Sequence, residues 1–139
     1  MAVGAGLVLA LGAMVFSDGR EDHFDDRAVA RLDGLNVAVE RRSVHWFLAE
    51  YDRRLVIEQD GAAAATLDLD MDTGGYSWVR VCRSSTGSIL LHDFLATYEV
   101  ERGAAHPKLA PRPALKGVCP TFLGSFDVDA RRVFRFIPH

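Results

Sequence analysis

The best-defined candidate for chemistry is a row of aspartates, Asp68, Asp70 and Asp72, that alternate with apolar residues. Calcium prefers oxygen ligands, and a chain curled around the ion would bring all three carboxylates to it. The spacing differs from an EF-hand loop, because Thr73 stands where the glycine is required and Val79 where the bidentate glutamate is required. A strand with three solvated carboxylates on one face and apolar residues in the core fits the same pattern. We expect the solvated strand, with calcium binding as the alternative.

A histidine followed by an aspartate is the second candidate. His92 and Asp93 could form a general base with its orienting carboxylate, and the preceding turn offers Ser84, Ser85 and Ser88 as nucleophiles. No GxSxG motif surrounds these serines, and adjacent residues on a strand point to opposite faces. The 5 histidines show no HxH, HxxxH or HExxH spacing for a local metal site. A small hydrolase is therefore a minor hypothesis, and no cofactor is predicted.

Two cysteines, Cys82 and Cys119, are the only ones in the chain. Their wide separation excludes a CxxC zinc or redox motif. They would form one disulfide in an oxidising compartment and would otherwise be two small buried hydrophobic residues. The sequence leaves both alternatives open.

Large aromatic residues could form a platform for a carbohydrate or a peptide, because exposed rings stack on ligands. The residues concerned are Trp46, Tyr51, Tyr76, Trp78 and Tyr98. In β-rich domains such residues more often belong to the core or to cross-strand pairs. The core is the expected location.

The overall composition is that of an ordinary globular domain. The chain has 139 residues, of which 49% are hydrophobic and 25% charged. Its formal net charge of −3 lacks the basic excess on which phosphate-backbone binding depends. Nucleic acid is therefore not an expected partner.

The N-terminal segment, residues 1–17, is the most apolar part of the chain. No charged residue occurs from Ala2 to Phe16, and such a run makes about 24 Å of helix, slightly less than the hydrocarbon core of a bilayer. Ala2, Gly6 and Ala10 recur at every fourth position, which places a stripe of small residues along one side of the helix. Such stripes let a neighbouring transmembrane helix approach closely. The segment is therefore predicted to be a single-pass membrane anchor; a core helix or a signal-peptide remnant is the alternative.

The elements that would position these residues are mainly strands. We expect an acidic linker over residues 18–34 that includes a short helix from Asp25 to Leu32, and then a β-rich domain over 35–139. Residues 43–55 fit either a helix or a strand, and a strand is preferred because its neighbours are strands. Asp60-Gly61 predicts a hairpin turn, and residues 103–120, which hold most of the prolines, predict a long loop. The predicted fold is an antiparallel meander or sandwich, or else an α+β fold, preceded by a transmembrane helix.

These observations favour a membrane-anchored, non-catalytic accessory or assembly subunit. Its N-terminal helix would pack on other membrane-protein subunits within the lipid bilayer, with the large domain extracytoplasmic. An extracytoplasmic module that binds a small ligand, a glycan or calcium is the alternative from another class. The small hydrolase is the third.

Overall fold

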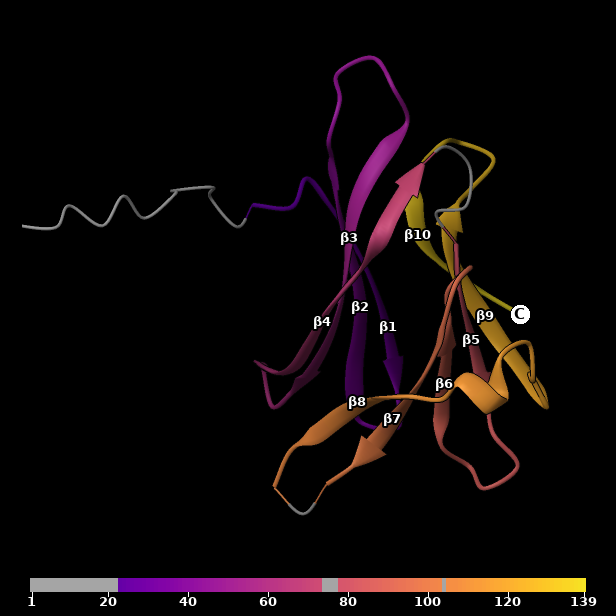
Figure 1. The fold of residues 1–139 in the computed structure, drawn as a ribbon. Helices are drawn as coiled ribbons and strands as arrows, with labels where there is room; N and C mark the ends of the chain where they lie inside the picture. Colours follow the sequence, from indigo (N-terminus) through magenta and orange to yellow (C-terminus); the bar gives the residue numbers. More distant parts are fainter. Residues whose placement is uncertain (1–22, 74–77, 104) are drawn as a thin grey trace, which may run out of the picture.

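A computed structural model describes residues 23–73, 78–103 and 105–139 of the chain. The strands form two antiparallel sheets, one four-stranded in the order β1-β2-β3-β4 and one six-stranded in the order β10-β9-β5-β6-β7-β8 (Figure 1). The strands are β1 (Asp26–Leu32), β2 (Leu35–Ser43), β3 (Glu50–Gln59), β4 (Ala62–Thr73), β5 (Val79–Arg83), β6 (Ile89–His92), β7 (Thr97–Arg102), β8 (Pro107–Pro111), β9 (Thr121–Val128) and β10 (Phe134–Pro138). A single 3-10 turn, η1 (Pro113–Leu115), is the helical element of the described residues. The predicted mainly β, antiparallel fold is confirmed, whereas the N-terminal helix lies outside the described residues.

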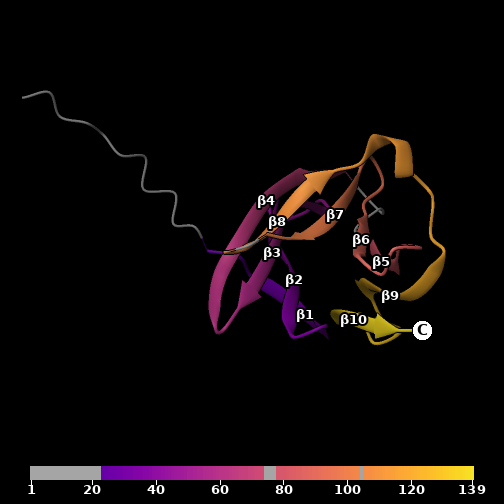
Figure 2. The same cartoon turned by 90° about the horizontal axis from the view of Figure 1, so that it is seen from below.

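The two sheets face each other across one apolar core (Figure 2). The first sheet contributes alternate residues of β2 and β3, such as Val37, Val39 and Leu55, and the second contributes Val81 and Leu91. At the sides, β1 lies beside β10 and β4 lies beside β8. The result is a sandwich in which each edge strand of one sheet lies beside an edge strand of the other.

The hairpins of the first sheet reverse at Asp-Gly pairs. Asp33 and Asp60 both have φ of 53°, and Gly34 and Gly61 both have φ of 80°. Two successive positive φ angles match the right-handed twist of the flanking strands. The turn predicted at Asp60-Gly61 is therefore confirmed.

The short helix predicted from Asp25 to Leu32 is wrong. This stretch forms β1, which pairs antiparallel with β2 through the turn at Asp33-Gly34. Ala28 and Ala30 are buried while Val29 is exposed, so the apolar side chains follow a strand period that the alanines conceal. Most of the segment assigned to an acidic linker is thus part of the sandwich.

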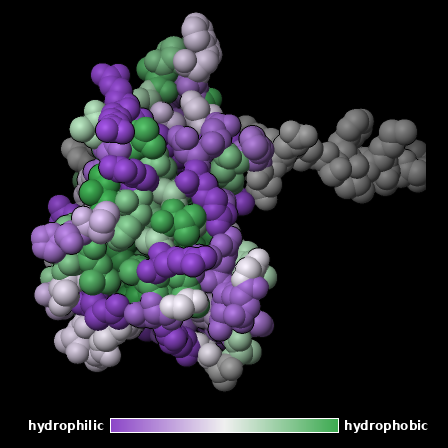
Figure 3. Space-filling model, turned by 180° about the vertical axis from the view of Figure 1, so that it is seen from behind, coloured by the Kyte–Doolittle hydropathy of each residue, from purple (hydrophilic) through white to green (hydrophobic). Residues whose placement is uncertain are grey.

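The connection between β2 and β3 is a loop, residues 44–49. The strand preferred across residues 43–55 is wrong for this part and correct from Glu50 onward. The loop projects beyond the rest of the sandwich at the top of Figure 1. Figure 3 shows hydrophobic residues beside weakly polar ones at the same place. We call it the aromatic loop, after Trp46 and Phe47.

The proline-rich segment is more ordered than predicted. Residues Pro107–Pro111 form β8, which pairs with β7 at the edge of the six-stranded sheet. An edge strand tolerates proline because one side of its backbone needs no ladder partner. The following residues, 112–120, form a strap that leads from the end of β8 to the start of β9, and the Cys82–Cys119 disulfide ties it to β5.

Candidate functional site

The three aspartates do not share one face of β4. The register slips between Tyr51↔Asp72 and Arg53↔Leu69, so β4 carries one more residue than β3 and the alternation reverses. Asp72 is consequently only 3% exposed, while Met71, expected in the core, is 45% exposed. The expectation of three aligned carboxylates is wrong.

The neighbours of these aspartates also differ. Asp68 accepts a hydrogen bond from Arg54 at 2.8 Å on the outer face of the sheet. The backbone carbonyl of Asp70 accepts one from the buried Arg53 at 2.9 Å. Among residues 23–73, 78–103 and 105–139, no group of three or more acidic, histidine or cysteine side chains is placed to hold a metal ion. The contacts of the Asp68 carboxylate and the Asp70 carbonyl are therefore contacts within the first sheet.

His92 and the candidate serine nucleophiles lie at opposite ends of β6. Ser88 directly precedes the strand and His92 is its last residue, which separates them by about 13 Å at ~3.3 Å per residue. His92 Nδ1 is bonded to Thr97 Oγ1 at 2.8 Å, whereas the Asp93 carboxylate accepts from Arg53 at 2.8 Å. The residues proposed for a hydrolase are not brought together.

His92 lies beneath the strap beside a small cavity of about 130 Å³, which is lined in part by Trp78, Arg80 and Lys116. Its Nε2 atom is buried without a hydrogen-bond partner among the described residues. Burial lowers the pKa of His92, and the neighbouring positive charge of Arg80 lowers it further. Among the described residues, only the contact with the Val118 backbone acts to raise this pKa. Burial and Arg80 therefore favour the neutral form of His92.

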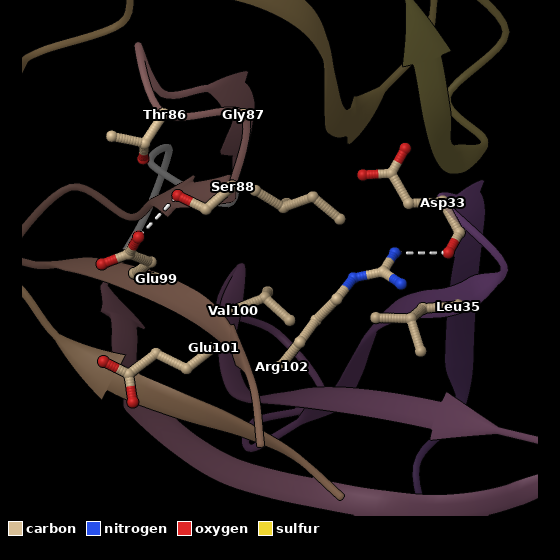
Figure 4. Close-up of a pocket in the computed structure, with 10 residues that line it drawn as sticks. Asp33, Leu35, Thr86, Gly87, Ser88, Glu99, Val100, Glu101 and Arg102 are labelled. Carbon is tan, nitrogen blue, oxygen red and sulfur yellow. Dashed lines mark hydrogen bonds between the residues drawn. The ribbon is translucent and has the colours of Figure 1, made fainter. Parts of the chain in front are cut away.

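A larger cavity, about 380 Å³, lies at the end of the sandwich that carries the Asp-Gly turns (Figure 4). Figure 4 shows Arg102 reaching towards Asp33, and its Nη2 donates to the Asp33 carbonyl at 2.5 Å. On the other side, Ser88 Oγ donates to Glu99 Oε1 at 2.5 Å. Polar groups from both sheets therefore line the cavity, together with the apolar side chains of Leu35, Ile89 and Val100.

The charged groups around this cavity are already paired. Hydrogen bonds from Arg83 lower the pKa of Asp33, and hydrogen bonds from Ser88 and Arg112 lower the pKa of Glu99. A ligand would have to replace these partners to bind a carboxylate. The cavity is thus bounded by charged groups that already have partners.

The opposite end of the sandwich carries several exposed apolar side chains beside the exposed Arg131 and Arg132, and we call it the apolar end. In the aromatic loop, Trp46 is 94% exposed and Phe47 64% exposed, and Val44 and Leu48 are exposed beside them. Exposed apolar side chains also occur in the 93–96 turn and near the β9–β10 turn. These are Phe94, Leu95, Val128 and Val133.

Two contacts between the sheets show that these loops share one end. Arg53, near the start of β3, reaches Asp93 in the 93–96 turn. Arg41, near the end of β2, lies between the rings of Tyr51 and Phe134, 4.4 and 4.3 Å from their centroids. The topology therefore gathers apolar loops from both sheets. Contiguous exposed apolar surface marks sites of contact with proteins or membranes.

The described part of the domain begins at this same end. Asp25 N donates to the Arg41 carbonyl at 3.1 Å, and its carboxylate accepts from Ser43 N at 3.3 Å, next to the aromatic loop. The small-residue stripe of Ala2, Gly6 and Ala10 lies outside the described residues. Within the described ranges, no helix is long and apolar enough to cross a membrane.

Sequence reasoning placed the aromatic residues in the core, and this is wrong for Trp46. Tyr51 and Tyr98 are largely covered, and Tyr98 packs against the core. The run from Val44 to Leu48 lacks the alternation of a strand, and this was the available signal that it forms an apolar loop.

Comparisons with known proteins assign no relative to this chain. No protein-family model matches it, no curated protein matches it, and no solved structure matches it.

Proposed function

We propose that this protein is a membrane-anchored, non-catalytic accessory subunit of a larger membrane complex. In this proposal residues 1–17 anchor the chain in the bilayer and the β-sandwich stands over the membrane with its apolar end towards it. The observation that carries the proposal is the coincidence of two features. The exposed apolar loops gather at the end where the N-terminal segment joins the domain.

The length of the intervening chain supports this orientation. Seven residues, 17–23, connect Phe16 with the start of the described domain, and they span at most about 25 Å at ~3.5 Å per residue. An anchor in the bilayer would therefore hold the apolar end near the membrane surface. The turn end, with its Asp-Gly pairs and the polar cavity, would face the aqueous phase.

The disulfide supports an extracytoplasmic placement of the domain. Cys82 and Cys119 are joined, and disulfides persist mainly in oxidising compartments. The strap tied by this bond covers the outer face of β5, so the bond belongs to the folded architecture.

Membrane extraction of the full chain tests the proposal. We expect the protein to stay with membranes in alkaline carbonate, to need detergent for release, and to migrate with other subunits on a native gel. Gly6→Leu is expected to release it from those subunits but not from the membrane, because a bulky residue blocks close helix approach. Val8→Leu, off the small-residue stripe, is the matched control. A chain recovered as a free monomer without detergent would refute the proposal.

A ligand-binding module is the second candidate, and the 380 Å³ cavity at the turn end favours it. Leu35 and Val100 give the cavity an apolar part beside its polar wall. Thermal-shift screening against neutral polyols and monosaccharides tests this function. Glu101→Gln serves as a lining variant and Asp68→Asn as a control remote from the cavity.

A further inference from the structure

The aromatic loop is the most exposed apolar element of the described chain. Trp46 and Phe47 occupy adjacent positions at its tip, and their rings contact each other edge to face with centroids 5.1 Å apart. A domain that met only water would lower its free energy by covering such rings. The loop instead extends them away from the core.

The loop backbone is held in this extended form. Val44 N donates to the Glu50 carbonyl at 3.0 Å, and Ser43 Oγ donates to the His45 carbonyl at 2.8 Å. His45 Nε2 lies 3.2 Å from a Glu50 carboxylate oxygen. These contacts fix the base of the loop, so a partner that receives the rings would have little ordering entropy to overcome.

We propose that the aromatic loop inserts the Trp46 and Phe47 rings into the interfacial layer of the lipid bilayer. This inference rests on the proposed membrane anchoring and gives the domain a second membrane contact, separate from residues 1–17. Trp prefers the membrane interface because its ring is apolar while its N–H still finds polar partners there. Leu48, which is also exposed, would enter the adjacent acyl region.

The position of the proposed anchor indicates that lipid is the partner of the aromatic loop. The aromatic loop lies beside Asp25, where the chain arrives from the N-terminal segment. A bilayer that holds that segment is then within about 25 Å of residue 23 by chain length alone, and Asp25 contacts Ser43 at the base of the loop. The exposed Phe94 and Leu95 belong to the same end and would rest against the same surface.

Tryptophan fluorescence tests the inference, because the chain has only 2 tryptophans. In the full chain, Trp78→Phe leaves Trp46 as the sole emitter. After reconstitution into vesicles of phosphatidylcholine and phosphatidylglycerol, we expect its emission to shift to the blue and brominated lipids to quench it. A matched control carries Trp46→Phe, Trp78→Phe and Thr86→Trp, which moves the single indole to the turn end. This control should show neither change.

Flotation of the same vesicles separates the two proposals. A chain that floats with lipid while Trp46 is quenched no more than the Thr86→Trp control would overturn lipid insertion and leave the anchoring intact. A chain that does not float would overturn both. Quenching that disappears when co-purified subunits are added would also overturn lipid insertion, since a protein would then occupy the loop.

A charged tip provides the complementary variant. Phe47→Asp, in the Trp78→Phe background, should abolish the blue shift while flotation is unchanged. Phe47 is exposed, so the far-ultraviolet circular dichroism should match that of the parent. Retention of the full shift in this variant would contradict insertion of the loop tip.

Discussion

A buried ion pair between the two sheets is expected to dominate the stability of the apolar end. Arg53 Nη1 lies 2.8 Å from Asp93 Oδ1, and the two side chains are only 3% and 2% exposed. Arg53 Nη2 also donates to the Asp70 carbonyl, while Arg53 Nε has no partner among the described residues. Asp93 therefore supplies a counter-charge to a guanidinium buried in the sandwich.

Asp93→Asn should be strongly destabilising, because it leaves that guanidinium buried without its counter-charge. Breaking a buried ion pair by removing one partner costs about 3–5 kcal/mol. The urea midpoint of the folded chain, assayed in detergent by circular dichroism, should fall accordingly with little change in the slope. The double variant Arg53→Met with Asp93→Leu should recover most of the loss, because apolar residues of similar volume can replace a buried ion pair.

The neighbouring pair on the outer face is the control. Arg54 and Asp68 are also 2.8 Å apart, but the Asp68 side chain is 76% exposed. Exposed pairs contribute less than about 1 kcal/mol, so Asp68→Asn should lower stability only slightly. Equal losses for Asp93→Asn and Asp68→Asn would refute the reasoning, as would a double variant no more stable than Asp93→Asn.

Three further predictions concern the rest of the sandwich. Replacing Cys82 and Cys119 by alanine should cost about 4 kcal/mol on the chain-entropy estimate for a sequence separation of 37, measured by urea unfolding; a loss below ~1 kcal/mol would contradict it. Burial lowers the pKa of His92 below its ordinary 6.5, so the folded state prefers the neutral side chain. The stability that this side chain contributes is therefore present above pH 6.5 and is lost as the pH falls towards the pKa of the folded state. His92→Gln should flatten this part of the stability profile, and an unchanged slope would contradict the assignment. Gly124→Ala should cost about 1–3 kcal/mol, because φ there is 147° and a Cβ would lie 2.5 Å from the Ile137 carbonyl oxygen; an unchanged melting temperature would contradict this.

The sequence predicted the features that depend on local backbone chemistry. The Asp60-Gly61 turn and the antiparallel strands of the domain both follow from short-range patterns, and both are present. Such features depend on φ preferences and on one buried face, both of which a few residues can encode.

Other features could not be predicted because they depend on partners far away in the chain. The bulge in β4 that exposes Met71 and buries Asp72 depends on the register against β3, and no local pattern specifies it. The buried residues of β1 are Ala28 and Ala30, and alanine fits either a helix or a strand. The local pattern therefore did not identify this segment as a strand. Pro107 and Pro111 are tolerated because β8 is an edge strand, and its place in the sheet is a property of the whole fold.

The candidate site shows the same division. The apolar run from Val44 to Leu48 can be recognised in the sequence, but its exposure to solvent follows from the loop geometry. The gathering of this loop with Phe94 and Leu95 follows from the packing of one sheet on the other. That arrangement, together with the point at which the N-terminal segment joins, is the basis of the functional proposal.

Paramagnetic broadening of amide signals tests the orientation most directly. The full chain would be placed in lipid nanodiscs in which a fraction of the lipids carry a paramagnetic headgroup. We predict that amides of residues 44–48 and 94–95 broaden strongly, while those of the turns at Asp33-Gly34, Asp60-Gly61 and Ser84–Gly87 keep their intensity. Equal broadening at both ends, or stronger broadening at the turns, would contradict an apolar end that faces the membrane.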